Sequence, residues 1–172
     1  RYSRPAMARI WSDESKLARW LEVELAALDG WASVGVVPEE AVREIRERAE
    51  APTPKRVAEI EERTQHDVAA FVDAVAEPLG PVGRWFHYGL TSSDVGDTTL
   101  CWQMRDAADL LIEASSALLG TLIDLAREHR DTVMIGRTHG IHAEPTTFGT
   151  KVALWALQVD RDRRRLRASR HT

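Results

Sequence analysis

The sequence predicts an all-α protein, and three of its features support this expectation. Apolar residues recur at steps of three and four positions, the spacing that places side chains on one face of a helix. Capping residues and acids precede these runs, where unpaired N–H groups and the positive end of the helix dipole favour them. No stretch alternates apolar and polar residues between turn signals, as a half-buried strand would. We therefore expect a small N-terminal helical domain, residues 1–91, followed by the beginning of a long-helix bundle, residues 92–172.

The first predicted helix begins at the capping residue Ser12 and ends near Gly30 or Gly35, because glycine is common where helices stop. Its apolar face consists of Leu17, Trp20, Leu21, Leu25 and Leu28. A second helix opens with Pro38, which fits the first turn of a helix, and continues to Ala49. Both are amphipathic, so we expect each to bury one face.

The rest of the N-terminal domain is punctuated by proline and glycine. A break at residues 51–54 precedes a helical stretch from Val57 to Ile60. Thr64 is expected to cap a helix that runs from Gln65 to about Ala76. The segment 80–83, rich in glycine and proline, then interrupts the chain again.

The longest predicted helix begins at Ser92 and continues to about His129. A helix of that length normally needs partners along its whole length, as in a bundle. Its apolar stripe suits a bundle seam and consists of Leu100, Met104, Ala107, Leu111, Ala114, Leu118, Leu122 and Leu125. Residues 132–149 are then expected to form a loop rich in Gly, Thr and His, and a final helix runs from about Phe148 to the end. The leucine and tryptophan stripes are all expected to be core.

Charge and composition restrict the classes of function. The formal net charge is −4 at pH 7, so the chain as a whole has no electrostatic preference for nucleic acid or anionic lipid. No apolar run approaches the roughly 20 residues that cross a bilayer. The single cysteine, Cys101, cannot form an internal disulfide. We expect a cytoplasmic protein with no nucleic-acid or membrane partner. Both ends look cut, since there is no initiator Met and the sequence stops inside a helical pattern.

Three polar clusters, residues 64–67, 87–94 and 136–147, hold four of the six histidines. Each is expected at or near a helix N-terminus, where unpaired N–H groups and a positive field bind carboxylate or phosphate. Hydroxyl groups in the clusters add donors, and a histidine can hold or deliver a proton near neutral pH. The sequence therefore predicts a site that holds a small anionic substrate and transfers protons to it.

Simpler interpretations of the first two clusters remain open. The Thr-Ser-Ser-Asp segment at residues 91–94 could be only a helix cap. His66, at the start of a predicted helix, could likewise be a cap or a surface residue. His87 lies between Phe86 and Tyr88, so it could be a hydrogen-bonded histidine of the core.

Two other patterns have competing explanations. His139 and His142 have a three-residue spacing that zinc ligands can use, but Gly140 and Pro145 disfavour the helix that usually presents such a pair. The arginine-rich segment 161–170 could be a basic patch. Aspartates are interleaved with these arginines, which favours a solvated or inter-helix face over contact with nucleic acid.

The strings in the three clusters closely resemble segments of the adenylosuccinate lyase family, a branch of the fumarase/aspartase superfamily. They are TQHDV, HYGLTSSDVGDT and GRTHGIHAEPTTFG. The opening string RYSRPAMARIWSDESKLARWLEVELAAL also resembles that family's N-terminus. Because the resemblance covers essentially the whole chain in the right order, the chain is identified as an N-terminal portion of a member.

The resemblance implies a reaction and an assembly. The family eliminates fumarate from adenylosuccinate, giving AMP, and from the succinyl precursor of aminoimidazole carboxamide ribotide, both in purine biosynthesis. A proton is removed beta to the leaving nitrogen, a carbanion is stabilised by a carboxylate, and the nitrogen is expelled as it is protonated. No metal or organic cofactor is implied. The family's active sites combine segments of three subunits of a homotetramer.

The resemblance also assigns roles to residues by their position in the motifs. His139 matches the general acid that protonates the departing nitrogen, and His66 matches a histidine that supports it. The positions matched to substrate binding are Arg1 and Tyr2 at the phosphate, His87 near the phosphate, Asp67 on the substrate side, and Thr91, Ser92 and Thr138 at the succinyl carboxylate. Hydroxyls and helix N–H groups there suit the negative charge of the carbanion.

One part of the family's site is missing from the sequence. The family's catalytic base is a serine on a loop with a Gly-Ser-Ser-x-Met-Pro-x-Lys-x-Asn pattern, and no such string occurs here. We therefore expect this chain alone to be inactive. The alternatives are another enzyme of the superfamily, such as argininosuccinate lyase or a carboxymuconate cycloisomerase, and a non-catalytic helical assembly module.

Overall fold

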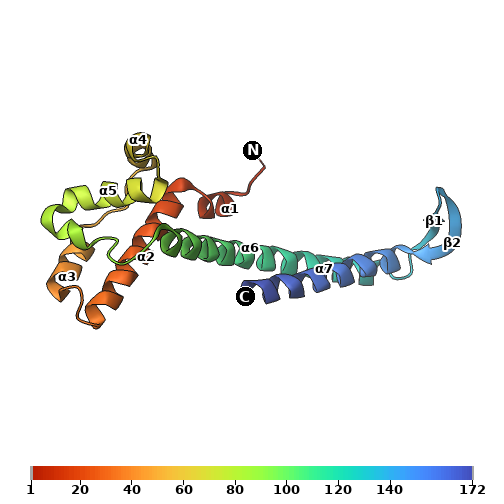
Figure 1. Cartoon of the computed structure of the whole chain (residues 1–172). Helices are drawn as coiled ribbons and strands as arrows, with labels where there is room; N and C mark the ends of the chain where they lie inside the picture. Colours follow the sequence, from red (N-terminus) through yellow and green to blue (C-terminus); the bar gives the residue numbers. More distant parts are fainter. Residues whose placement is uncertain (1, 172) are drawn as a thin grey trace. The chain divides into compact units, whose positions relative to one another are not determined.

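The computed structural model describes residues 2–171, and helices dominate that range (Figure 1). Seven α-helices, one 3-10 helix (η1) and one two-stranded sheet are present among the described residues. In chain order they are α1 (Pro5–Ile10), α2 (Asp13–Ser33), α3 (Glu39–Arg48), α4 (Pro54–Thr64), α5 (Asp67–Leu79), η1 (Gly80–Trp85), α6 (Ser92–Glu128), β1 (Val133–Thr138), β2 (Ile141–Thr147) and α7 (Phe148–His171). The predicted helical class is confirmed, with a small β-hairpin added. Within the described range, no helix is long and apolar enough to cross a membrane.

The chain divides into two compact units, residues 1–103 and 104–172, and the division falls inside α6. The first unit contains α1 to α5, η1 and the first turns of α6. The second contains the rest of α6, the hairpin and α7. The predicted domain boundary near residue 91 stays a prediction.

The first unit has one hydrophobic core, built from the buried faces of α2, α3, α4 and α5. The predicted apolar face of α2 is buried throughout. Phe71 of α5 is completely buried and packs edge-on against Trp20 of α2, with ring centroids 5.3 Å apart. On another side it contacts Phe86, at 6.0 Å between ring centroids. This core fixes the segment around residue 86 against the start of α5.

Several helix boundaries differ from the predicted ones. The structure has a short helix, α1, that the sequence analysis did not predict, and α2 continues through Gly30. The helix predicted over 57–60 begins already at Pro54, because Thr53 caps it by accepting a hydrogen bond from the N–H of Arg56. Thr64 was wrongly predicted to cap α5: it ends α4, and its hydroxyl donates to the carbonyl of His66.

In the second unit, α6 and α7 run side by side and the hairpin extends from the end where they are joined (Figure 1). Gly149 makes this junction tight, since a Cβ there would lie 2.5 Å from the carbonyl oxygen of Ala126. Near the far end of α7, Arg170 forms an ion pair with Asp109 of α6. Ion pairs within α7 join Asp160 to Arg163 and Arg164, and Asp162 to Arg165. These pairs support an inter-helix or solvated face for the arginines.

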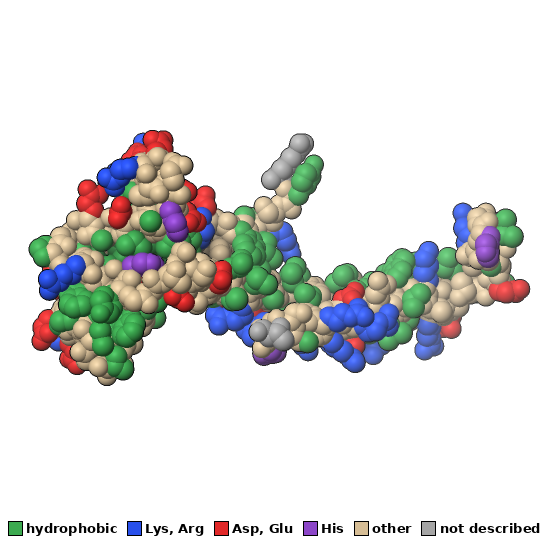
Figure 2. All heavy atoms as spheres, in the orientation of Figure 1, with side chains coloured by type: hydrophobic (Ala, Val, Ile, Leu, Met, Phe, Trp, Pro, Cys, Tyr) green, Lys and Arg blue, Asp and Glu red, His purple; other side chains and the backbone are tan. Residues whose placement is uncertain are grey.

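The apolar stripe of α6 is mostly uncovered in this chain. Of its eight predicted positions only Ala107 is buried, while Leu100, Met104, Leu111 and Leu118 are exposed. Trp155 and Leu157 of α7 are exposed as well. Figure 2 shows hydrophobic side chains on the surface of these helices. The expectation that all these positions are core is therefore wrong for this chain, because α6 and α7 supply only two helices where a bundle needs more.

Residues 132–149 were predicted to form a loop, and this prediction was wrong. Strands β1 and β2 pair antiparallel, from Val133 opposite Thr147 to Thr138 opposite Ile141, with a register shift between Ile135 and Arg137. The two central residues of the turn, His139 and Gly140, have φ angles of 51° and 74°. Positive φ at both positions is the signature of a type I′ turn, whose twist matches that of the flanking strands. The turn and the backbone pairing thus form a hairpin despite the irregular side-chain pattern.

Candidate active site

The first polar cluster lies at the junction between α4 and α5. Gln65 ends α4 in the left-handed conformation, with φ of 52°, and this turns the chain sharply. His66 then caps α5: its Nδ1 accepts from the N–H of Ala69 at 3.4 Å. Asp67 accepts a hydrogen bond from the N–H of Val68 at 2.8 Å, and its Oδ1 lies 3.5 Å from Nδ1 of His66. Nδ1 of His66 thus faces α5 and Asp67. The other ring nitrogen, Nε2, takes no part in these contacts.

The second cluster begins with His87, which is tied to a buried acid. Nδ1 of His87 lies 2.6 Å from Oε1 of Glu24 in α2. The Glu24 side chain has no exposed surface, and burial raises the pKa of its carboxyl above the usual range, while the hydrogen bond and charge of His87 act in the opposite direction. The alternative interpretation of His87, a hydrogen-bonded histidine of the core, is therefore correct for the Nδ1 edge of its ring. The side chain of His87 still keeps 24% of its surface exposed.

Glu24 was missed by the sequence analysis. The signal was present, because this acid stands inside the apolar face of α2, one turn after Leu21 and directly before Leu25. An unpaired carboxylate is costly in such a place, so it indicates a partner from elsewhere in the chain. The partner lies 63 residues away, and sequence spacing alone does not reveal it.

The start of α6 is closed by a reciprocal cap. The N–H of Thr91 donates to Oδ2 of Asp94 at 2.9 Å, and the N–H of Asp94 donates to the carbonyl of Thr91 at 3.0 Å. Capping by this segment is therefore real, but it uses the side chain of Asp94. Within residues 2–171 the hydroxyls of Thr91 and Ser92 make no hydrogen bond to other protein groups. They remain available at a helix N-terminus, where an anion is stabilised.

The third cluster lies on the hairpin of the second unit. His139 occupies the turn and is exposed, and its Nδ1 lies 3.0 Å from the hydroxyl of Thr138. The cluster was expected at a helix N-terminus, and this is wrong for Thr138 and His139, which belong to a β-turn. His142 is exposed on β2. Among the described residues no group of three or more His, Cys, Asp or Glu side chains is placed to hold a metal ion.

The remaining predicted residues lie at the N-terminus. Tyr2 is 92% exposed in the segment before α1. Arg1 lies outside the described residues. Gln103 of α6 holds the end of α1, because its side-chain amide donates to the carbonyl of Ile10 at 2.6 Å. The last residue of α1, the helix that follows Tyr2, is thus attached to α6.

The predicted residues fall into two groups, one in each unit. The first unit contains His66, Asp67, His87, Thr91 and Ser92, on segments that the contact between Phe71 and Phe86 brings together. Figure 2 shows the histidine side chains of this unit on one face. The second unit contains Thr138 and His139. The candidate residues are therefore described as two separate groups, one in each unit.

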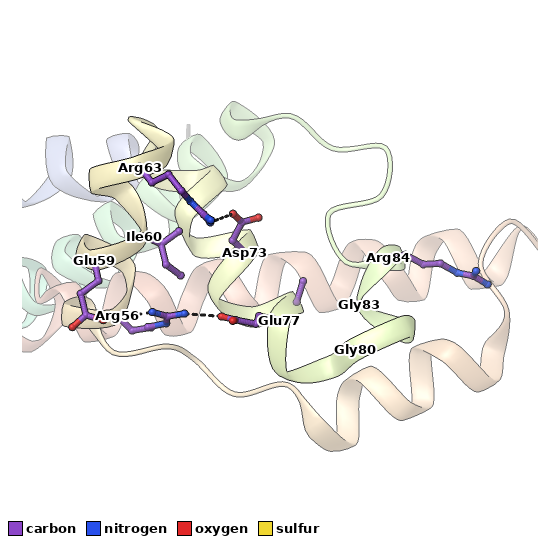
Figure 3. Close-up of a pocket in the computed structure, with 10 residues that line it drawn as sticks. Arg56, Glu59, Ile60, Arg63, Asp73, Glu77, Gly80, Gly83 and Arg84 are labelled. Carbon is purple, nitrogen blue, oxygen red and sulfur yellow. Dashed lines mark hydrogen bonds and ion pairs between the residues drawn. The ribbon is translucent and has the colours of Figure 1, made fainter.

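Two hollows lie outside these groups. One, of about 710 Å³, lies between α4, α5 and η1 and contains none of the predicted residues (Figure 3). Two of its arginines face acids: Arg56 pairs with Glu77, and Arg63 with Asp73. A second hollow, of about 900 Å³, lies between the hairpin and α7 and is lined by Arg137, Lys151 and Leu154, among others. Neither holds the histidines, so the candidate site is better described by the two groups than by a closed cavity.

Comparisons with known proteins agree in the class of protein they find. A family model described as "Lyase" matches residues 1–172. The adenylosuccinate lyase of Bacillus subtilis (strain 168) is 48% identical over 170 residues, 99% of this chain and 39% of that protein. The chain thus spans about two fifths of the length of the curated relatives it matches.

Solved structures also match closely. A fumarate lyase from Mesorhizobium sp. BNC1 matches with a TM-score of 0.88 and 34% identity, covering 98% of this chain and 41% of that one. The 3-carboxy-cis,cis-muconate lactonizing enzyme from Pseudomonas putida matches with a TM-score of 0.90 and 34% identity, covering 97% of this chain and 40% of that one.

Proposed function

The chain belongs to the lyase family, and on that premise we propose that it is part of an adenylosuccinate lyase. The proposed reaction eliminates fumarate from adenylosuccinate, giving AMP, and from the succinylated ribotide that yields aminoimidazole carboxamide ribotide. Identity of 48% to a curated adenylosuccinate lyase supports this choice within the family. The observation that carries the chemistry is the exposed His139 in a hairpin turn, beside the hydroxyl of Thr138.

In the proposed mechanism His139 is the general acid. A base removes a proton from the carbon beta to the leaving nitrogen, and the electron pair moves to form the double bond of fumarate as the carbon–nitrogen bond breaks. The nitrogen takes its proton from His139, so that one proton leaves carbon and one reaches nitrogen. An imidazole suits this role because its pKa lies near neutral pH in the absence of perturbation. The turn exposes the ring, which lets it reach a substrate.

The first unit is proposed to bind the substrate and support the acid. His66 supports the general acid, and Asp67 lies on the substrate side. The hydroxyls of Thr91 and Ser92, together with the positive end of α6, hold the succinyl carboxylate and stabilise the growing carbanion. Thr138 adds to the same binding. Tyr2, His87 and Arg1 are proposed to hold the nucleotide phosphate.

The site is proposed to be completed by other copies of the protein and by further residues of the polypeptide. His139 and His66 belong to different units, and a homotetramer can bring them together from different subunits. The catalytic base is supplied by a serine loop that this sequence does not contain. No metal or organic cofactor is proposed. The 172-residue chain alone is expected to be inactive, and turnover by this chain, free of longer enzyme, would contradict that expectation.

The proposed function is tested by measuring fumarate release from adenylosuccinate by the protein extended to its natural C-terminus. Replacing His139 by Ala is expected to lower kcat by about a hundredfold or more, the range that one general acid contributes. His171→Ala, which removes an exposed histidine outside the candidate site, serves as the matched control and should keep normal activity. A folded tetramer that releases no fumarate from adenylosuccinate, but turns over argininosuccinate or a carboxymuconate, would move the assignment to another enzyme of the superfamily.

A further inference from the structure

Glu24 is a buried acid that lies beside the partly exposed His87. Glu24 lies on the apolar face of α2, among leucines that are themselves buried. Its Oε1 is 2.6 Å from Nδ1 of His87, whereas its Oε2 is buried without a hydrogen-bond partner among the described residues. A carboxylate in such surroundings is costly, and replacing a buried ionic pair by apolar side chains is often neutral or stabilising. Stability of the core therefore gives no reason for an acid here.

The backbone that carries His87 is held in an unusual conformation. His87 has a φ of 62°, in the left-handed region that few residues other than glycine adopt. Two residues on, Gly89 has a φ of 70°, and a Cβ there would lie 2.7 Å from the ring of Trp31. For His87, which is not glycine, this conformation carries a moderate cost that the surrounding structure must offset, and such positions are often found at functional sites.

The neighbouring side chains restrict the movement of this segment. Tyr88 packs edge-on against Trp31 and Trp85, with ring centroids 5.8 Å and 5.4 Å away. On the other side of His87, Phe86 is buried in the core against Phe71. The position of the His87 ring is thus determined by core packing on both sides and by Glu24 at Nδ1. Only its remaining edge can meet another molecule.

We propose that Glu24 is a positioning residue that accepts the Nδ1–H of His87 and so presents the Nε2 edge of that ring to the substrate phosphate. A carboxylate that accepts from one ring nitrogen fixes the orientation of the imidazole and places the proton on that nitrogen. An imidazole that donates from Nδ1 to Glu24 can donate from Nε2 to an anionic phosphate when both nitrogens carry a proton. The inference rests on the proposed function, which assigns His87 to the phosphate. Glu24 itself touches no substrate and acts only through His87.

The test uses the protein extended to its natural C-terminus, with adenylosuccinate as the probe. Glu24→Leu removes the acceptor with a side chain that fits the apolar surroundings. Because it leaves His87 without its partner, it is expected to lower stability, and circular dichroism establishes that the protein used for KM is folded. KM should rise by roughly 10-fold or more, the size expected when one hydrogen bond to a charged group is lost. Since a phosphate contact acts equally on ground state and transition state, kcat should stay within about twofold. Glu22→Gln, on the exposed side of α2, is the matched control and should change neither.

Two further variants separate positioning from a general effect on the fold. Glu24→Gln keeps an acceptor oxygen without the charge, so its KM should lie between those of the unchanged protein and Glu24→Leu. In a His87→Asn background, Glu24→Leu should raise KM no further, because its effect passes through the histidine. An unchanged KM in Glu24→Leu, or an equal rise in the His87→Asn background, would overturn the inference.

A spectroscopic measurement keeps the inference separate from the proposed function. In protein labelled with ¹⁵N-histidine, Nδ1 of His87 should carry a proton in the unchanged protein, and Glu24→Leu should shift its resonance toward the mixture of tautomers seen in free imidazole. If the unchanged protein releases no fumarate, the proposed function fails, while this shift still supports the positioning by Glu24. An identical His87 spectrum in both proteins would overturn the positioning, whatever the activity.

Discussion

The two units of this chain differ in how they treat their apolar side chains. The first buries the predicted face of α2 and surrounds Phe71 with aromatic partners. The second leaves Leu111 and Leu118 of α6 exposed. The candidate residues differ in the same way, because His87 is held by a buried acid and His139 is exposed in a turn. Core packing thus fixes the candidate residues of the first unit, whereas Thr138 and His139 of the second unit are exposed on a hairpin.

The largest effect is expected in the core of the first unit. Phe71→Ala removes a side chain that is completely buried and contacts both Trp20 and Phe86. It should lower the free energy of unfolding by about 3–5 kcal/mol, the usual cost of deleting a buried aromatic ring. Urea denaturation followed by circular dichroism measures this change. A loss below about 1 kcal/mol would show that the first unit does not depend on this core.

A smaller effect is expected where the second unit is packed most tightly. Gly149→Ala places a Cβ 2.5 Å from the carbonyl oxygen of Ala126 and 2.6 Å from the Cα of Arg130, so the junction of α6 and α7 must shift. We expect a loss of about 1–3 kcal/mol, as for other overpacked sites. Amide hydrogen exchange should show the loss around residues 126–149, with Gly120→Ala as control, since a Cβ at Gly120 meets no atom within 4 Å. If Gly149→Ala and Gly120→Ala lowered hydrogen-exchange protection equally, the close packing of α6 and α7 at Gly149 would be contradicted.

In the 172-residue chain, the smallest effect is expected on the exposed stripe of α6. Leu118 is 49% exposed, so Leu118→Ala should change the stability of the 172-residue chain by about 0.5 kcal/mol or less. In the extended and assembled protein, bundle partners are proposed to cover this face, and the same substitution should cost about 2–5 kcal/mol. Thermal unfolding of both forms measures the difference. Equal small losses in both would show that nothing covers the stripe.

Sequence reasoning succeeded best for the long helices, because their signal is local and repeated. The predicted helix from Ser92 to about His129 corresponds to α6, and the final helix begins at Phe148 as expected. The exposure of the stripe could not be predicted in the same way. Spacing shows which residues share a face, whereas burial depends on which other helices are present.

The hairpin was missed because its pattern is irregular. Gly136 and Pro145 interrupt any alternation of polar and apolar residues, and the register shifts between Ile135 and Arg137. The one usable signal was the pair His139-Gly140, which resembles the Asn-Gly turns of two-residue hairpins. Histidine is among the few residues other than glycine that adopt positive φ at moderate cost.

The motifs identified the candidate residues but not how they are divided. His66 and His87 were predicted together with His139, and the structure places the last in a different unit. The link between His87 and Glu24 was missed, since it joins positions 63 residues apart. Whether the two groups act on one substrate stays a prediction, and it is the central claim about this protein.

Complementation between inactive variants tests that claim most directly. Tetramers of the extended protein carrying His66→Ala and tetramers carrying His139→Ala are prepared separately, and each should release fumarate at a small fraction of the normal rate. After the subunits are dissociated, mixed and reassembled, we expect activity to return, because some sites then combine an intact His66 from one subunit with an intact His139 from another. Mixed tetramers that form but remain as inactive as their parents would contradict a site shared between subunits.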